Sequence, residues 1–118
     1  MQNDLERRTF DFAVRIVNLK DDLIENKKEF ELSRQILKSG TSIGANVAEA
    51  QQAQSRADFA SKMNIALKEA AETKFWLKLL NATNKFTDRE LDSILQECIE
   101  IEKILYSIVR TSKKTSEE

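Results

Sequence analysis

The sequence predicts an all-α fold, an up-down-up-down antiparallel four-helix bundle, from three observations. Proline is absent and glycine occurs only at positions 40 and 44, whereas β-rich and α/β folds need turn residues at many connections. Apolar residues recur at alternating steps of three and four along four segments. Short connections join these segments, which makes successive helices antiparallel neighbours. The length of 118 residues fits one domain, 1–118.

The first helix is expected over about residues 3–26 and the second over about residues 30–53. Asn3, with Glu6 three positions later, supplies a capping start for the first helix. The apolar seams are Leu5, Thr9, Phe12, Ile16, Leu19 and Leu23 in the first helix, and Ile36, Gly40, Ile43, Val47, Ala50 and Gln54 in the second. Each glycine costs roughly 1 kcal/mol of helix propensity relative to alanine. A break at residues 39–41 is therefore the alternative, and we favour continuity because the apolar register passes through both glycines.

The third helix is expected over about residues 56–83 and the fourth over about residues 87–111. Ser55 with Asp58, and Thr87 with Glu90, have the spacing of capping boxes. The seams are Phe59, Met63, Ala66, Ala70, Thr73, Leu77 and Leu80 in the third helix, and Leu91, Ile94, Cys98, Ile101, Leu105 and Ile108 in the fourth. The polar tail from Ser112 onward is expected to fray.

Two helices carry more apolar surface than a single seam needs. The additional residues, our candidate oligomer contact, are Phe10, Val14 and Val17 on the first helix and Leu95, Ile99, Tyr106 and Val109 on the fourth. One interpretation is a generous core, because bundle helices use a wider apolar face than a two-stranded contact does. The other is contact with a second copy of the chain, because monomers rarely leave large apolar patches in water.

Small residues dominate positions 39–50, where Gly40, Gly44 and Ala48 recur every four residues and let another backbone approach closely. A polar stripe beside them and carboxylates of the third helix form a candidate polar helix-crossing network: Ser39, Ser42, Asn46, Glu49, Glu69 and Glu72. One interpretation is a tight crossing whose paired polar groups fix the helix register. A ligand or partner site and a catalytic site are the functional alternatives.

The composition argues against several chemistries. Histidine is absent, which removes the commonest general base and the Glu-x-x-His pairs of di-iron bundles. Cys98 is the only cysteine and falls in an apolar seam, so we expect a small buried hydrophobic residue there. Glycine-rich phosphate loops and activated-serine motifs are missing. We therefore expect a protein that is not an enzyme, with no catalytic residues, no cofactor and no metal.

Hydropathy and charge limit the kinds of partner that we expect for this protein. No apolar run approaches the ~20 residues of a membrane span, and the first residues lack the order of a signal peptide, so we expect no membrane contact and a cytoplasmic location. The 19 basic and 20 acidic residues nearly cancel, unlike those of a dedicated phosphate-backbone binder. Residues 33–85 are locally basic, and Arg34, Lys38, Lys74 and Lys78 are candidate nucleic-acid contacts. Solvated helix faces are the interpretation that we favour for these residues.

The chain resembles a known bacterial family, and the residues that show this most clearly lie in its middle. Residues 36–50, which include Ser42, Asn46, Ala48 and Glu49, and residues 58–59 and 66–77 are similar to four-helix-bundle proteins of 23S ribosomal RNA gene intervening sequences, sometimes labelled S23 ribosomal proteins. The resemblance covers nearly the whole chain. It implies an up-down four-helix bundle that assembles as a ring-like homopentamer, with no established catalytic residues.

The resemblance extends to a related branch, the accessory proteins of diversity-generating retroelements, which are basic and bind nucleic acid and a reverse transcriptase. This chain departs from that branch in its net charge of −1. The leading hypothesis is a non-enzymatic oligomeric interaction or scaffold protein whose partners are copies of itself and a protein or ribonucleoprotein. The second is a module that binds structured RNA through the basic residues of the second and third helices. The third is a ligand or catalytic site at the polar crossing.

Overall fold

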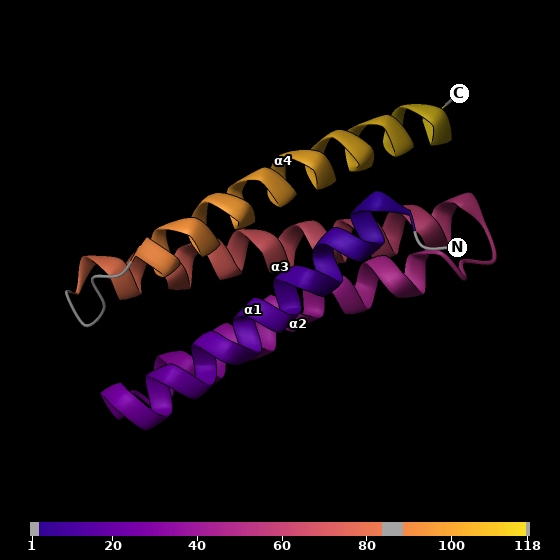
Figure 1. Cartoon of the computed structure of the whole chain (residues 1–118). Coiled ribbons are helices and arrows are strands. Elements are labelled where there is room, and N and C mark those ends of the chain that lie inside the picture. Colours follow the sequence, from indigo (N-terminus) through magenta and orange to yellow (C-terminus); the bar gives the residue numbers. More distant parts are fainter. Residues whose placement is uncertain (1–2, 84–88, 118) are drawn as a thin grey trace.

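The computed structural model describes residues 3–83 and 89–117, and within these ranges the chain forms four helices and no strand. Helices α1 (Asp4–Lys27), α2 (Glu31–Ala50), α3 (Arg56–Ala82) and α4 (Arg89–Glu117) run alternately up and down (Figure 1). The predicted all-α four-helix fold is confirmed.

The helix boundaries agree with the apolar pattern within one residue for α1 and for α3. Helix α2 continues through both glycines, so the favoured continuity is confirmed. It ends three residues earlier than expected, because the N–H groups of residues 51–53 donate to carbonyls only three positions back and tighten the last turn. The cap expected at Thr87 lies outside the described residues, as does the start expected for the fourth helix.

The end of α4 also differs from the expectation. The helix runs to Glu117, whereas a frayed tail was expected from Ser112 onward. The tail contains neither glycine nor proline, so nothing in its backbone chemistry stops the helical hydrogen-bond pattern.

The helix ends show why the chain turns where it does. Asn3 Oδ1 accepts from the Glu6 N–H at 2.6 Å, and Ser55 Oγ accepts from the Asp58 N–H at 3.0 Å, as the capping signals predict. Lys28 ends α1 in the left-handed region with φ of 55°, and the N–H of Glu29 donates to Leu23 O at 3.0 Å. The chain therefore reverses between α1 and α2 within three residues.

The core consists almost entirely of the predicted seams. The largest fully buried side chains are Phe12, Ile16, Leu23, Ile36, Ile43, Met63, Leu77, Leu80, Leu91, Ile94, Ile101 and Leu105. They come from all four helices and form one cluster. The three-and-four apolar rhythm thus predicts which face of each helix turns inward.

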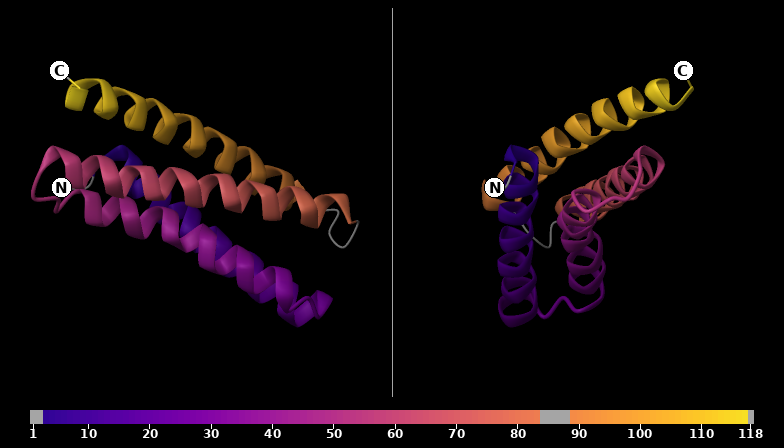
Figure 2. Two further views of the ribbon diagram at one scale, coloured as in Figure 1. Left: turned by 180° about the vertical axis from the view of Figure 1, so that it is seen from behind. Right: turned by 90° about the vertical axis from the view of Figure 1, so that its right-hand side faces the viewer.

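The four helices follow one another around the bundle in chain order. Each packs against its neighbour in sequence, and α1 makes a smaller contact with α4, while among the described residues the backbones of the diagonal pairs do not approach closely. Figure 2 shows that the α1–α2 and α3–α4 hairpins diverge toward the α1–α2 turn. The bundle therefore has four outer faces, and the α1–α2 face lies opposite the α3–α4 face.

Candidate functional site

The α1–α2 face exposes an apolar strip on α1. Phe10, Val14 and Val17 keep 60%, 46% and 39% of their surface in solvent. Next to Phe10 lies a hollow of about 300 Å³, the α1–α2 hollow, lined by Glu6, Phe10, Ala13, Thr41, Gly44, Ala45 and Ala48. Of these lining residues only Glu6 carries a charge. The three predicted contact residues of the first helix therefore remain available to a partner.

The α1–α2 hollow exists because α2 presents almost no side chain there. A Cβ placed on Gly44 would lie 3.1 Å from the carbonyl oxygen of Thr9, so the two backbones nearly touch. At Gly40 a Cβ would lie 2.8 Å from Cγ1 of the buried Ile16. The small residues of α2 thus fix the distance to α1, and Ala45 and Ala48 beside them leave the outer groove unfilled.

The α3–α4 face presents a second aromatic side chain. Tyr106 is 58% exposed, and beside it lies a hollow of about 270 Å³, the α3–α4 hollow, lined by Leu67, Glu102, Lys103 and Tyr106. Leu95 is half-buried and packs against the core, and Ile99 is also half-buried. This face therefore offers less apolar surface than the sequence predicts, and the exposed part of it is concentrated at Tyr106.

The prediction that Val109 contacts another subunit is wrong. It was expected among the oligomer contacts, but it is 5% exposed and belongs to the core of its own chain. Eighteen residues separate it from the buried Leu91, and eighteen residues make five whole helical turns, so both side chains point the same way.

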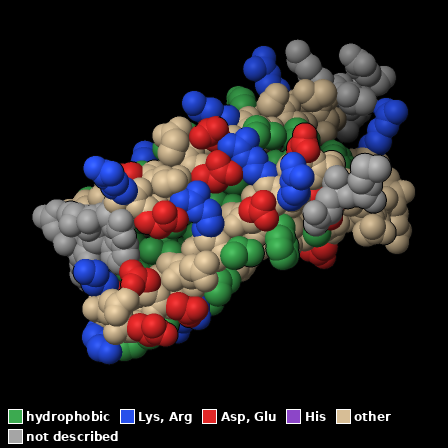
Figure 3. All heavy atoms as spheres, viewed as in Figure 1, with side chains coloured by type: hydrophobic (Ala, Val, Ile, Leu, Met, Phe, Trp, Pro, Cys, Tyr) green, Lys and Arg blue, Asp and Glu red, His purple; other side chains and the backbone are tan. Residues whose placement is uncertain are grey.

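The α1–α4 face is charged and internally paired. Arg8 donates to both oxygens of Glu97 at 2.7 and 2.8 Å and to Glu100 at 3.0 Å, and Arg15 donates to Glu90 at 2.9 Å. The hydrogen bonds from Arg8 lower the pKa of Glu97, and the same contact raises the pKa of Arg8. Figure 3 shows the interleaved basic and acidic side chains of this face.

The polar helix-crossing network is divided into local contacts. Thr73 donates to Ser39 Oγ at 2.9 Å, which joins α3 to α2 in the buried interior, and Ser39 donates to Gln35 O. Ser42 donates to Lys38 O, and Asn46 Nδ2 donates to Ser42 O, so both stay within α2. Thr73 was expected as an apolar seam position, and its hydroxyl is the polar group of that seam, which is the signal in the sequence that something on a neighbouring helix must pair with it.

The three carboxylates of the predicted network lie nearer the surface. Glu49 is exposed and lies 3.8 Å from Lys62 Nζ. Glu72 is exposed, and Glu69 is half-buried. Burial raises the pKa of Glu69, and the charge of the neighbouring Glu72 adds to the shift. The structure therefore does not gather the six predicted residues around one cavity.

The candidate nucleic-acid residues lie on two different faces. Lys74 points toward α4, where its Nζ donates to Glu102 at 2.6 Å. Arg34 lies 3.2 Å from Glu31 of its own helix. Lys38 lies on the α2–α3 side, where its positive charge partly offsets the raised pKa of Glu69. Lys78 is exposed. The four residues do not form one basic patch on a single chain.

The comparisons with known proteins decide the family. The sequence profile of the 23S rRNA-intervening sequence proteins matches residues 1–107. The chain belongs to this family. A solved protein with unknown function from the S23 ribosomal protein family of Bacteroides thetaiotaomicron VPI-5482 is 55% identical, with a TM-score of 0.86 over 89% of this chain and 97% of that chain. Among curated proteins none matches. The predicted resemblance to the intervening-sequence family is confirmed.

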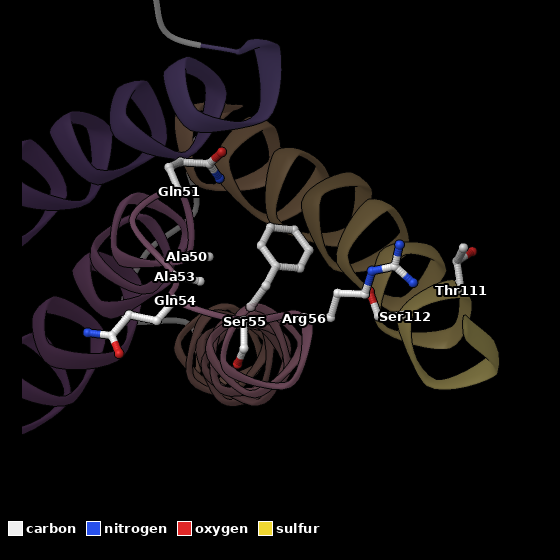
Figure 4. Close-up of a pocket in the computed structure, with 9 residues that line it drawn as sticks. Ala50, Gln51, Ala53, Gln54, Ser55, Arg56, Thr111 and Ser112 are labelled. Carbon is white, nitrogen blue, oxygen red and sulfur yellow. The ribbon is translucent and has the colours of Figure 1, made fainter. Parts of the chain in front are cut away.

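A further hollow of this family member lies at the end of the bundle where α2 meets α3. It measures about 460 Å³, more than the α1–α2 and α3–α4 hollows, and is lined by Ala50, Gln51, Ala53, Gln54, Ser55, Arg56, Phe59, Thr111 and Ser112. Figure 4 shows Arg56 extending from α3 toward Thr111 and Ser112 of α4. Most of its polar lining side chains are exposed to solvent, whereas ligand sites usually bury a few converging polar groups.

Other reactive groups in this family member are few. Cys98 is buried, its thiol lies 3.4 Å from Ala70 O, and burial raises its pKa to about 12, so it is a poor nucleophile. Among the described residues no group of three or more acidic or cysteine side chains is placed to hold a metal ion. Nor does any described helix combine the length and apolar character required to cross a membrane.

Proposed function

We propose that this protein is a non-enzymatic, self-associating interaction protein that forms a closed ring of identical subunits in the cytoplasm. The observation that supports it is the strip of Phe10, Val14 and Val17 on α1, beside a hollow with one charged lining residue. A monomer would leave this strip in water, whereas a neighbouring copy would cover it. The stoichiometry of five comes from the family resemblance.

Light scattering after size-exclusion chromatography, together with native mass spectrometry, tests this proposal. At micromolar concentration we expect about 68 kDa, five times the 13.6 kDa of one chain. A strict monomer would overturn the proposal. Another closed stoichiometry would overturn the number five and keep the self-association.

Binding of structured RNA is the second candidate function. It draws support from the solved relative, which is described as a member of an S23 ribosomal protein family. Lys38 and Lys78 would be the principal contacts, because Arg34 and Lys74 already lie beside carboxylates. A ring would repeat these cations around its circumference and raise the local positive charge.

Electrophoretic mobility with structured RNA at several salt concentrations tests the second candidate. Phosphate contacts release counterions, so the affinity should fall steeply between 50 and about 200 mM salt. A Lys38→Gln, Lys78→Gln double variant should bind more weakly and show a shallower salt slope. No binding of the unaltered protein at low salt would remove this candidate.

A further inference from the structure

The two outer hollows of the bundle are the basis of one further inference, which rests on the proposed self-association. We propose that Tyr106 of one copy enters the α1–α2 hollow of the next copy, while Phe10 of that next copy enters the α3–α4 hollow beside Tyr106. The contact is head-to-tail, and Glu6 of one copy pairs with Lys103 of the other.

The shapes of the two faces support this pairing. Phe10 is 60% exposed and Tyr106 is 58% exposed, and each of these two aromatic side chains borders its own hollow. The hollows measure about 300 and 270 Å³, which is room for one aromatic ring each. Aromatic side chains buried in pockets near the centre of an interface often supply much of its binding energy.

The charges of the two hollows are complementary. Glu6 is the charged residue of the α1–α2 hollow, and within the described part of the chain its carboxylate forms no ion pair. Lys103 of the α3–α4 hollow likewise forms no ion pair with a described residue, whereas its neighbour Glu102 is held by Lys74 at 2.6 Å. The unpaired charge is thus negative in one hollow and positive in the other, which favours contact between the two unlike hollows.

The placement of the two faces makes the proposed contact heterologous. The α1–α2 and α3–α4 faces lie on opposite sides of the bundle, because neighbouring helices pack in chain order and, among the described residues, the backbones of the diagonal pairs do not approach closely. A contact between unlike, opposite faces is heterologous, and such contacts close into rings when the rotation per subunit allows. In this arrangement the charged α1–α4 face stays in water. A symmetric contact between two α1–α2 faces would leave Tyr106 uncovered.

Charge reversal provides the sharpest test. Glu6→Lys and Lys103→Glu should each weaken assembly about tenfold or more, measured by light scattering over a dilution series, because like charges then meet at the contact. The double variant should restore assembly.

Tyr106→Ser tests the aromatic contact and should also dissociate the oligomer. Phe75→Ser is the control. Phe75 is 57% exposed, but its ring packs on Trp76 of its own helix, so this variant should still assemble. Circular dichroism establishes that each variant remains helical.

Disulfide cross-linking tests the direction of the contact. The native cysteine, Cys98, is buried and should therefore not form cross-links itself. A mixture of Ala45→Cys and Lys103→Cys proteins should form a cross-linked pair under mild oxidation, and Ala45→Cys alone should not. Cross-linking of Ala45→Cys alone would show a symmetric contact and overturn this inference.

The two proposals fail in different ways. If the unaltered protein is a monomer, the proposed function fails. If it assembles and the Tyr106→Ser and charge-reversed variants assemble equally well, only the contact proposed here is wrong. Dissociation by both single reversals without rescue by the double variant would overturn the Glu6–Lys103 pair.

Discussion

Helix α1 packs against its two neighbours by opposite means. Against α2 the two backbones pack closely because Gly44 has no side chain. A Cβ at this position would lie 3.1 Å from Thr9 O. Against α4 the contact is made by long charged side chains, Arg8 and Arg15, which bridge to carboxylates at 2.7 to 2.9 Å. The first contact is apolar and buried, whereas the second is partly exposed.

The difference separates a rigid contact from an adjustable one. Close packing of backbone and core atoms tolerates almost no added volume, because repulsion rises steeply with overlap. Ion pairs at a half-exposed surface are held by flexible side chains, and water screens them. We therefore infer that the α1–α2 hairpin is the fixed unit of the bundle, and that α4 is held against α1 more loosely.

The largest expected effect is at Ile16, whose side chain fills the space over Gly40. Ile16→Ala should lower the free energy of unfolding by about 3 kcal/mol, since the residue is fully buried and its removal leaves a cavity. Gly40→Ala should cost about 1 to 2 kcal/mol, because its new methyl group meets Ile16 atoms at 2.8 and 2.9 Å. Urea denaturation at one protein concentration gives both values.

Combining the two changes tests whether they share one space. In the double variant the alanine methyl at position 40 occupies room that Ile16 has vacated, so the combined loss should be smaller than the sum of the single losses by roughly 1 kcal/mol. Strict additivity would contradict the rigid contact that we infer between α1 and α2.

Gly44→Ala probes the same contact at the backbone. Alanine at a helix-interior position normally stabilises by about 1 kcal/mol relative to glycine. Here the new Cβ would meet Thr9 O at 3.1 Å, and a helical backbone cannot retreat as a side chain can, so we expect a net loss of about 1 kcal/mol. Ala71→Gly, at an exposed position of α3, is the matched control and should lose about 1 kcal/mol from helix propensity alone. If Gly44→Ala were more stable than the unaltered protein, α1 would have to shift to make room for the new methyl group.

Much of this fold follows from the sequence alone. The apolar rhythm identifies the buried face of each helix, and the caps at Asn3 and Ser55 follow from local side-chain chemistry. Continuity of α2 through Gly40 and Gly44 also follows, because a helix that breaks there would lose its apolar register. These features depend on residues within one or two turns of each other.

The features that could not be predicted depend on the rotation of one helix against another. The small residues of α2 indicate a close neighbour, but only the structure shows that Gly40 and Gly44 meet α1, while Ser39 meets α3. Arg8 and Glu97 are 89 positions apart, and many other exposed pairs of opposite charge were equally possible. Val109 was misplaced because a small error in helical phase accumulates over five turns.

Arg8→Met probes the adjustable contact and should cost about 1 kcal/mol at pH 7. The pKa of Glu97 is lowered in the folded state, so its contribution is complete above its ordinary pKa of 4.5 and is lost as the pH falls through the folded value. The stability difference between the unaltered protein and Arg8→Met should therefore shrink on acidification below that pH. Urea midpoints at pH 7 and at about pH 3 give the comparison. A difference that grows in acid would reverse the sign we assign.

The smallest effect is expected at Arg15, the second bridge between α1 and α4. Its partner Glu90 keeps 61% of its side-chain surface in solvent, whereas Glu97, the partner of Arg8, keeps 23%. Water screens the Arg15 pair more strongly, so Arg15→Met should change the free energy of unfolding by no more than about 0.5 kcal/mol. Thermal unfolding at about 0.01 M and at about 1 M salt measures it, because an ion pair that contributes to stability weakens as the Debye length contracts from ~30 Å to ~3 Å. A loss as large as that of Arg8→Met would show that the greater exposure of Glu90 does not weaken the Arg15 bridge.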